Sequence, residues 1–405
     1  MVKESLDNYL ENLSEEDPKR FSTIAIKERP DLFETKVLRI KRGWGNKKTE
    51  REVLVASRDP GSGGSLLPVI EELQKDSGIV AITDGWAEDK IKKSFKTRDI
   101  TPKGRKSFVM SGITEIHPDV ILMDASEEQG IDFHVDEALP DVPKVLVEDY
   151  YGSSDKFLRT AIERGLPLPE KICVMDVGAR EILIKKFPAL ESRVEVTGQP
   201  SFDRFAEEDT ENIAKKAKKK LKLKQDDKLI VFMSTIDGIE KATEIADALK
   251  KSGENFYFVF RRHPRDNTNY ADYKKVFEDV GIRVVDTEGI FTTDEIGAAA
   301  DVLLTTWSTV GLDAIYRRKP TVNIVDRKFP VPDGYDFPLV PVKLGASIGV
   351  DEIGQLSDVL PKLLDGKSQL NAQLFKNMER YYLADGKNAK RVADVVRSLK
   401  KNDKG

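Results

Sequence analysis

The sequence predicts an α/β protein built from two successive parallel-sheet domains, and three observations support this prediction. The chain has 405 residues, whereas a single hydrophobic core stops growing at about 250–300 residues. Short β-branched and apolar runs alternate with helix-length segments, which is typical of parallel strands covered by helices on both faces. This alternation breaks at residues 206–227 and then begins again. We therefore predict one α/β domain on each side of the break.

The first series predicts an N-terminal domain at residues 52–200. Its strands are expected at Val53–Ala56, Ile79–Ile82, Val120–Met123, Val145–Val147, Ile172–Met175 and Val194–Val196. Residues 1–51 are charged and weakly patterned, and we interpret them as an N-terminal extension. Apolar side chains at helical spacing in residues 6–13 indicate a short helix. Lys36–Glu50 is interpreted as a strand followed by a basic turn.

The second series predicts a C-terminal domain at residues 201–385, followed by a C-terminal helix and tail at 386–405. Its strands are expected at Leu229–Phe232, Phe256–Phe260, Arg283–Val285, Val302–Leu304 and, last, Thr321–Val325. Leu356–Lys400 is mostly helical. Two such series imply two Rossmann-like halves facing each other across a cleft. Because ligands bind outside the carboxyl ends of strands in open α/β sheets, that cleft is the expected site.

Composition excludes several classes of protein. Lys and Arg number 66 and Asp and Glu number 70, a net charge of -4, whereas nucleic-acid binders usually carry a basic excess. No nucleic-acid partner is therefore expected. The single cysteine, Cys173, cannot form an internal disulfide and indicates a reducing compartment. No run approaches the ~20 apolar residues of a membrane span, and the N-terminus lacks the apolar core of a signal peptide. We expect a cytoplasmic protein.

One local feature is the lysine-rich run KKAKKKLKLK at residues 215–224. The favoured interpretation is a solvated helix face followed by a loop. The alternative is a peripheral membrane contact, because lysine clusters near a surface attract anionic lipid. Composition is compatible with both.

The first motif of chemical interest is the glycine-rich segment Ser57–Ser65, which follows the first strand directly. Glycines allow the backbone to approach a ligand, and the helix expected at Leu66–Lys75 presents N–H groups that favour an anion. The segment matches neither G-x-G-x-x-G nor an NTPase phosphate loop, since no lysine follows the glycines. A tight strand-to-helix turn is the structural alternative. The binding candidates here are Gly61, Ser62, Gly63 and Gly64.

The second motif is Thr305–Ala314, which opens the helix after the strand Val302–Leu304. Ser308 and Thr309 stand at the helix start, where hydroxyls either cap the helix or hold phosphate oxygens together with backbone N–H groups. Asp313 lies one turn into the helix, and a carboxylate there can accept hydrogen bonds from two ribose hydroxyls. Capping alone does not explain a glycine and an acid in this segment, so phosphate and ribose binding are predicted.

Two further candidates follow other strands of the second series. Arg261, Arg262 and His263 stand at the end of Phe256–Phe260 and can complement a diphosphate. The alternative is a charged loop. A weaker candidate pair, of a kind common in strand-to-helix turns, is Ser234 and Thr235.

Several segments resemble those of two-domain nucleotide-sugar enzymes with the GT-B fold. Residues 194–203 resemble their interdomain V-x-V-T-G-x-P-x-x-D segment, and residues 301–314 resemble D-v-v-i-T-x-x-S-S-x-G-x-E-A. Lys319–Val322 and residues 385–393 resemble the following k-P-v-i and d-G-x-a-a-x-R-i-a segments. The nearest groups are the CDP-glycerol glycerophosphotransferases, the Kdo-transferases and the UDP-GlcNAc 2-epimerases. The resemblance covers residues 52–400 and is specific only in these short segments.

The resemblance implies a GT-B fold whose C-terminal helix crosses back to the N-terminal domain. Gly198 and Pro200 would lie at the hinge into the second domain. Asp313 would take the place of the family's Glu on the ribose, with a shorter side chain. The donor-phosphate residues carried over are Ser308 and Thr309, together with Arg262 and His263 from a segment like the K-x-H-P of the glycerophosphotransferases.

The implied reaction must stabilise a leaving nucleotide diphosphate and, if it inverts, needs a base for the acceptor hydroxyl. The metal-holding D-x-D motif occurs nowhere in the chain, so we expect a metal-independent reaction without a cofactor. Basic side chains and the helix start near Ser308 would carry the leaving-group charge. The base is expected at a strand end of the N-terminal domain, with Asp59 as first choice and Asp84 as second. The other strand-end carboxylates there are Asp124, Glu148 and Asp149.

Three functions stay open at this point. The first is a glycosyltransferase that moves a sugar or related group from a nucleotide-activated donor, with uridine assumed, to an acceptor hydroxyl in glycan or cell-envelope polysaccharide synthesis. The second is a UDP-GlcNAc 2-epimerase-like epimerase or hydrolase, ranked lower because residues 305–309 depart from the T-D-S-G-G pattern of that group. The third is a non-catalytic nucleotide-sugar-binding protein.

Overall fold

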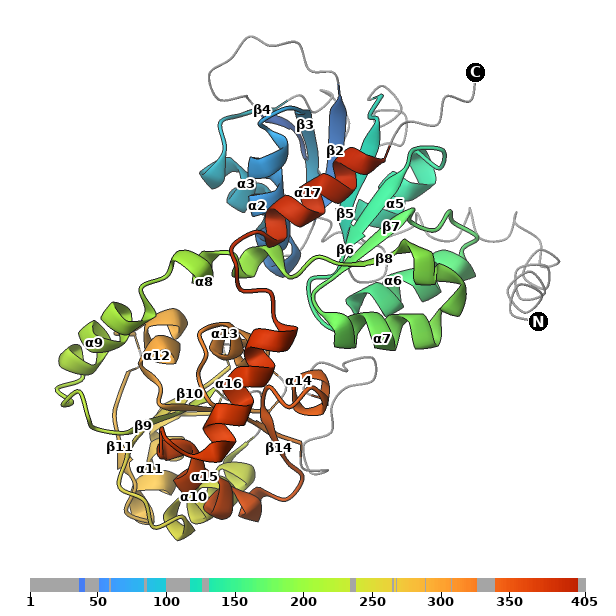
Figure 1. The fold of residues 1–405 in the computed structure, drawn as a ribbon. Coiled ribbons are helices and arrows are strands. Elements are labelled where there is room, and N and C mark those ends of the chain that lie inside the picture. The colour runs from blue at the N-terminus through green and yellow to red at the C-terminus, as the bar shows by residue number, and fades with distance from the viewer. Residues whose placement is uncertain are drawn as a thin grey trace. The chain divides into compact units, whose positions relative to one another are not determined.

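The chain forms two compact units, each with a central sheet and covering helices (Figure 1). The N-terminal unit contains Met1–Asp203 and Lys387–Gly405, and the C-terminal unit contains Arg204–Gly386. The computed structural model describes residues 36–40, 51–57, 60–83, 86–99, 117–125, 131–233, 238–263, 266, 268–287, 289–306, 308–325 and 339–399.

Among the described residues, the sheet of the N-terminal unit has eight strands in the order β4-β1-β3-β2-β5-β6-β7-β8. The strands are β1 (Lys36–Ile40), β2 (Glu52–Ser57), β3 (Gly78–Thr83), β4 (Thr97–Asp99), β5 (Val120–Asp124), β6 (Lys144–Val147), β7 (Lys171–Val174) and β8 (Val194–Val196). β1 runs antiparallel to β3 and β4, and the ladders from β3 through β2 to β8 are parallel. The parallel strands are continuous apolar runs because both of their faces are buried.

Local sequence sets the ends of several helices in this unit. The helices are α2 (Pro60–Leu73), α3 (Trp86–Ser94), α5 (Ile131–Ala138), α6 (Ser153–Glu163), α7 (Val177–Lys186) and α17 (Asn388–Ser398), with 3-10 turns η2 (Pro188–Arg193) and η3 (Pro200–Phe202). The Asp176 carboxylate caps α7 by accepting a hydrogen bond from the backbone N of Ala179 at 2.8 Å. Pro188 and Pro200 begin the two 3-10 turns, where a missing N–H costs nothing.

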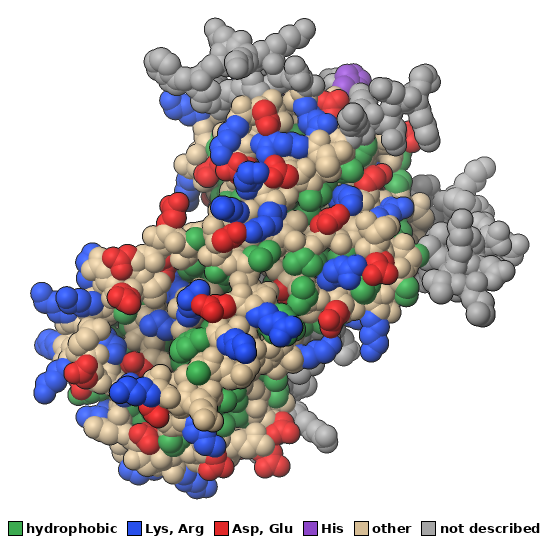
Figure 2. Space-filling model, viewed as in Figure 1, with side chains coloured by type: hydrophobic (Ala, Val, Ile, Leu, Met, Phe, Trp, Pro, Cys, Tyr) green, Lys and Arg blue, Asp and Glu red, His purple; other side chains and the backbone are tan. Residues whose placement is uncertain are grey.

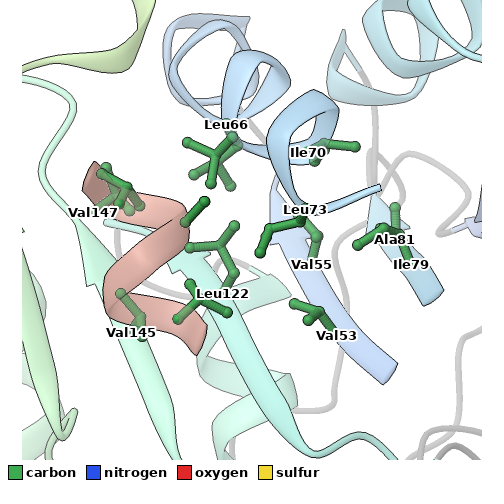
Figure 3. Packing of buried hydrophobic residues seen from close by; sticks show 14 of the residues in the cluster. Val53, Val55, Leu66, Ile70, Leu73, Ile79, Ala81, Leu122, Val145 and Val147 are labelled. Atoms are coloured by element: carbon green, nitrogen blue, oxygen red, sulfur yellow. The ribbon is translucent and has the colours of Figure 1, made fainter. Parts of the chain in front are cut away.

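The core of the N-terminal unit lies where α2 and α17 cover the sheet (Figure 3). Val53 and Val55 of β2 and Leu122 of β5 lie in one cluster with Leu66 and Ile70 of α2, and each of the five is at most 1% exposed. A fully buried side chain of this size stabilises the fold by roughly 1.5–3 kcal/mol. This layer therefore fixes α2 and the carboxyl ends of the strands relative to each other.

Helix α17 returns the chain from its C-terminal region to the N-terminal unit. Val392 and Val396 are fully buried in the same core cluster. The Asp203 carboxylate accepts hydrogen bonds from the backbone N of Asn388 at 2.9 Å and of Ala389 at 2.8 Å, so a negative charge caps the positive end of the helix. The predicted crossing of the C-terminal helix back to the N-terminal domain is confirmed.

Gly198 lies beside this cap and explains part of the VTGQPSFD segment. Its φ is +81°, a region that favours glycine, and a Cβ there would lie 2.0 Å from Oδ1 of Asn388. Nδ2 of Asn388 in turn donates to the carbonyl of Gln199 at 3.2 Å. The segment that the sequence placed at a hinge therefore also holds the first turn of α17.

In the described part of the C-terminal unit, the sheet has six parallel strands in the order β11-β10-β9-β12-β13-β14. The strands are β9 (Leu229–Met233), β10 (Tyr257–Arg261), β11 (Arg283–Val284), β12 (Val302–Thr305), β13 (Thr321–Ile324) and β14 (Ile348–Val350). This is the 3-2-1-4-5-6 order of the doubly wound Rossmann fold. The predicted α/β fold with two mostly parallel sheets is confirmed.

Helices on both faces complete the C-terminal unit. They are α8 (Arg204–Glu207), α9 (Thr210–Lys220), α10 (Ile239–Lys251), α11 (Tyr270–Asp279), α12 (Thr293–Ala299), α13 (Val310–Tyr316), α14 (Leu339–Lys343), α15 (Leu356–Leu364) and α16 (Gln369–Tyr381), with the 3-10 turn η4 (Ile353–Gln355). A capping box starts α12, in which Thr292 and Glu295 satisfy each other's backbone N–H groups.

Three parts of the fold differ from the sequence-based expectations. The glycine-rich segment is not a loop ahead of a helix at Leu66, because α2 already begins at Pro60. Proline suits the first helical position, where its missing N–H has no intrahelical partner. β14 follows the strand expected to be last, and β1 pairs within the main sheet although it lies in the segment interpreted as an extension.

Candidate functional site

The carboxyl ends of β9 and β12 mark the point where the strand order of the C-terminal sheet reverses. Ligands bind at such a switch point in open α/β sheets. The Thr305 hydroxyl donates to the carbonyl of Met233 across it at 3.0 Å. Ser234 and Thr235 come next after β9 but lie outside the described residues, so their role stays a prediction. The segment after β12 carries the candidates Ser308, Thr309 and Asp313.

Ser308 and Thr309 lie at the start of α13. The Ser308 hydroxyl accepts a hydrogen bond from the backbone N of Val310 at 3.4 Å, which is the capping alternative to phosphate binding. Thr309 is exposed and its side chain makes no capping hydrogen bond. A Cβ at Gly311 would lie 3.1 Å from a methyl carbon of Thr305. Close packing of α13 on β12 therefore explains the glycine, and phosphate binding by the two hydroxyls stays a prediction.

Asp313 lies in the first turn of α13, and its side chain is 18% exposed. Nη2 of Arg204 lies 3.4 Å from its Oδ2. Burial raises the pKa of Asp313 to about 6, although Arg204 and Arg317 act to lower it. The carboxyl therefore changes its charge in the neutral range, and in its ionised form it can accept hydrogen bonds from ribose hydroxyls.

Asp313 is part of an acid–arginine cluster, which we define as Arg204, Glu208, Asp294, Asp313 and Arg317. Arg317 donates to Glu208 at 2.6 and 2.7 Å and to Asp294 at 2.8 Å, and Arg204 donates to Asp294 at 2.9 Å. Burial acts to raise the pKa values of Glu208 and Asp294, but their bonds to arginine hold both below the usual value. Three carboxylates thus share two guanidiniums. Of the three, Asp313 has the raised pKa and is the most readily protonated.

Sequence reasoning singled out Asp313 but missed the other members of the cluster. Arg204 and Glu208 lie in and just after α8, Asp294 in α12, and Arg317 just after α13. These positions share no local pattern, so no sequence signal could have joined them.

The predicted basic motif begins with Arg261, the last residue of β10, and is half-buried. Arg261 donates to the carbonyl of Thr287 at 3.1 Å, and Arg262 donates to the carbonyl of Thr268 at 2.5 Å. Both arginines therefore hold neighbouring loops. His263 follows at the end of the strand and is half-buried as well. Contact of these side chains with a diphosphate stays a prediction.

The predicted bases Asp59 and Asp84 lie outside the described residues, so their roles stay predictions. Gly61, Ser62 and Gly63 belong to the first turn of α2, and Gly64 follows them in the helix. A Cβ at Gly64 would lie 3.2 Å from the ammonium of Lys90. The glycine thus gives the lysine room against α2.

The N-terminal sheet has its own switch point, between β2 and β5. The Ser57 hydroxyl donates to Oδ2 of Asp124 across it at 2.8 Å, and both residues are buried. Thr83 at the end of β3 is also buried, and its hydroxyl has no hydrogen-bond partner among the described residues. The glycine-rich segment therefore follows a strand whose end carries polar, buried groups.

A buried acid pair lies at the ends of β6 and β7. It consists of Glu148 and Asp176. The Tyr151 hydroxyl donates to Asp176, Nε2 of Gln199 donates to the carbonyl of Glu148 at 3.2 Å, and the backbone N of Gly152 donates to Oε1 of Glu148 at 3.3 Å. Oε2 of Glu148 has no hydrogen-bond partner within the described part of the chain.

The environment of the acid pair favours protonated carboxyls. Burial, with a further contribution from Asp176, raises the pKa of Glu148 well above its usual value. Burial also raises the pKa of Asp176 to about 6, against the opposing hydrogen bond from Tyr151. Ser153 and Ser154 open α6 nearby, and their buried hydroxyls have no partner among the residues described. Such groups are suited to bind a ligand hydroxyl.

No group of three or more His, Cys, Asp or Glu side chains in the described residues could hold a metal ion. No helix in the described part of the chain is long and apolar enough to cross a membrane. The expected metal independence stays a prediction.

Residues 171–331 match the family model described as CDP-Glycerol:Poly(glycerophosphate) glycerophosphotransferase. The matched segment runs from β7 past β13, so it contains the basic motif, α13 and the acid–arginine cluster. The match confirms the resemblance to the glycerophosphotransferase group and supports a transferase. Curated protein sequences gave no match.

Solved structures share the fold over most of their length. A UDP-GlcNAc 2-epimerase from Neisseria meningitidis, bound to UDP-GlcNAc, has a TM-score of 0.57 at 14% identity, over 85% of this chain and 99% of that one. A glycosyltransferase from Rickettsia africae has a TM-score of 0.58 at 11% identity, over 88% and 100%. The wall teichoic acid polymerase TagF has a TM-score of 0.50 at 13% identity, over 87% and 89%. These likenesses confirm the GT-B fold.

Proposed function

We propose that the protein transfers a sugar or a glycerophosphate-like group from a nucleotide-activated donor to an acceptor hydroxyl in cell-envelope polymer synthesis. The observation that supports this best is one of placement. The segment after β12, with Asp313, lies at the switch point of a 3-2-1-4-5-6 sheet, inside the part of the chain that matches the glycerophosphotransferase family. The fold alone would not support it, because the same fold hosts many functions.

On the donor side, Asp313 binds the ribose in this proposal, and Thr309, Arg262 and His263 bind the phosphates. A guanidinium carries five N–H donors, so the bond from Arg262 to Thr268 is compatible with a phosphate contact. The same bond holds the side chain in place before the donor arrives. Charge-assisted bonds of this kind stabilise the negative charge that develops on the leaving nucleotide.

On the acceptor side, a base must take the proton of the attacking hydroxyl. Asp59 remains the first choice from the sequence. Glu148 is the described alternative, because it lies at the end of a strand and its Oε2 has no hydrogen-bond partner among the described residues. Burial raises its pKa, so in this proposal it acts as a base only in its ionised form. The variants Asp59→Asn and Glu148→Gln, made separately, distinguish the two candidates. The residue whose amide variant loses turnover while keeping donor affinity is the base.

The released nucleotide tests the function and names the reaction. Sugar transfer breaks the bond from the anomeric carbon to oxygen and releases a nucleoside diphosphate, whereas glycerophosphate transfer breaks the diphosphate P–O bond and releases a nucleoside monophosphate. We expect CDP-glycerol or a nucleotide sugar, incubated with the protein and an acceptor in EDTA, to give one of these products. An isomerised donor would identify an epimerase instead. If calorimetry detects binding of neither CDP nor UDP, the proposal is overturned.

A further inference from the structure

The exposed half of α9 carries the lysine-rich run of the sequence. Successive helical residues are about 100° apart around the axis, so Lys215, Lys216, Lys219 and Lys220 share one side, and all four are exposed. Figure 2 shows Lys and Arg side chains over α9 at the left edge of the view, with acidic side chains beside them. We call these four lysines, together with the exposed residues of the turn that follows, Lys222 and Lys224, the α9 basic face.

The opposite side of α9 is packed against the C-terminal unit and uses one lysine of the run. Ala214 and Ala217 are buried. Lys218 is 5% exposed, and its ammonium donates to Oδ2 of Asp301 at 2.9 Å and to the carbonyl of Asp227 at 2.8 Å. Lys218 is therefore structural. The lysines that remain for a partner lie on the outer side only.

An exposed isoleucine lies directly beside the α9 basic face. Among the described residues, Ile290 and Val177 are the two exposed large hydrophobic side chains, at 52% and 39%. The Lys220 ammonium donates to the carbonyl of Ile290 at 2.9 Å and lies 4.4 Å from the ring centroid of Phe291. Lys220 thus ties the loop that carries the isoleucine to the end of the helix.

We propose that the α9 basic face and Ile290 together form a docking surface for an anionic lipid membrane. Lysines near such a surface are attracted to the anionic headgroups. An adjacent apolar side chain strengthens binding by inserting into the boundary between headgroups and acyl chains. Helix-dipole stabilisation accounts for lysines in the last turn of α9, but not for an isoleucine exposed beside them. A soluble polyanion would use the lysines and leave the isoleucine without a role. The inference goes beyond the proposed transfer reaction and does not depend on the donor site.

The test is cosedimentation of the full chain with vesicles of one part phosphatidylglycerol to two parts phosphatidylcholine, and with vesicles of phosphatidylcholine alone. At about 0.1 M salt, where the Debye length is about 10 Å, we expect binding to the anionic vesicles only. The paired variant Lys215→Gln with Lys219→Gln should bind about 25-fold more weakly, at about fivefold per lysine. Ile290→Ser should also weaken binding.

Matched controls come from the same chain. Lys250→Gln with Lys251→Gln removes two exposed lysines from the end of α10, and Val177→Ser removes the other exposed hydrophobic side chain. Both controls should bind vesicles like the unchanged chain. Wild-type failure to bind anionic vesicles, or test variants that bind as well as the controls, would overturn the proposal. If a heparin fragment binds, competes with the vesicles and binds the Ile290→Ser variant as tightly as the unchanged chain, the partner of this surface is a soluble polyanion and not a membrane.

Discussion

Asp313 has a structural role that the contacts show, and the proposed function adds a ribose contact to it. Its carboxyl shares Arg204 with Asp294 and lies in a cluster with more carboxylates than guanidiniums. Burial, with a smaller contribution from the neighbouring acids, raises its pKa to about 6. The charge of Asp313 therefore depends on pH in the neutral range, and so should the proposed contact with a donor ribose.

Replacement of Asp313 by Asn tests the ribose contact. We expect affinity for CDP or UDP to fall about tenfold at about pH 8, since a hydrogen bond to a charged group is worth about 1.5–3 kcal/mol. Near about pH 5 the difference should shrink, because the native carboxyl is then largely protonated. Calorimetric titration at both pH values measures this. Asp247→Asn, an exposed acid on α10, is the control, and equal affinity of both variants at high pH would remove Asp313 from the donor site.

Asp176 makes a prediction about stability rather than binding. Its folded pKa of about 6 lies above the ordinary value of 3.8, so the folded state holds the proton more tightly than the unfolded state. The stability from this proton is complete below about pH 4 and is lost as pH rises through about 6. Relative to Asp176→Asn, we expect the unfolding free energy of the native chain to fall by about 3 kcal/mol over this range.

Urea denaturation of both chains at a series of pH values measures this difference. Asn keeps the cap of α7, because it is as good an N-cap residue as Asp. Superimposable pH profiles for the two chains would show that folding does not raise the pKa of Asp176.

At the scale of elements, the segment from Gly198 to Asp203 and the start of α17 form one unit of local structure. The backbone of Gly198 makes room for Asn388, whose amide donates to Gln199, and Asp203 caps the helix that Asn388 begins. Each contact joins residues nearly 190 positions apart in sequence. The segment that the sequence predicts as a hinge therefore also positions helix α17.

Gly198→Ala should destabilise the N-terminal unit by about 2–4 kcal/mol, because it combines backbone strain at positive φ with a steric clash. Gly165→Ala is the matched control, since its φ is +65° and no atom of the described residues lies within 4 Å of its Cβ position. The control should cost only about 1 kcal/mol. Denaturant unfolding of both variants gives the comparison, and Asn388→Ala in the Gly198→Ala background should recover the part due to the clash. Equal losses for the two glycine variants would refute the clash.

For the whole molecule, the two sheets have separate cores, and the C-terminal helix belongs to the first of them. Ala389, Val392, Ala393 and Val396 lie in the cluster that contains the strands of the N-terminal sheet. Arg51 also donates to the carbonyl of Val396 at 2.9 Å. The last residues of the described chain thus complete the core of the first unit.

Deletion of residues 387–405 should therefore unfold or loosen the N-terminal unit and spare the C-terminal one. Loss of two buried valines alone removes roughly 3–6 kcal/mol of burial, a large part of the stability of a domain. Hydrogen exchange by mass spectrometry should show faster exchange in β2 and α2 and little change in β9 and β12. Deletion of residues 400–405 is the control and should exchange like the full chain. Equal acceleration in both sheets would contradict two separate cores.

Much of the fold could be predicted because its signal is local. Runs such as Val120–Met123 and Leu229–Phe232 became central strands, since continuous apolar sequence at that length is satisfied by burial on both faces. The strands β4 and β14 are not predicted from the sequence, because the first, TRD, has no apolar residue and the second, IGV, is interrupted by a glycine. The sequence predicts a loop at Pro60, whereas this residue starts α2.

The candidate site was predictable only in outline. Motif position placed Asp313 after a strand end, and the structure puts that strand at the switch point of its sheet. Arg204, Glu208 and Arg317 could not be found in this way, because ion pairs form between side chains that only the folded path brings together. The same holds for the Glu148 and Asp176 pair, whose raised pKa values come from burial that the sequence does not display.

The sequence by itself determined the alternation of strands and helices, the two α/β domains and the strand ends that carry polar motifs, since hydrophobic period and turn residues act over a few positions. Only the tertiary structure decided the strand order, the cap of Asp203 on α17, the acid–arginine cluster and the outward side of the lysine-rich helix. These depend on which distant segments become neighbours and on how much water each side chain loses, and both are properties of the folded chain.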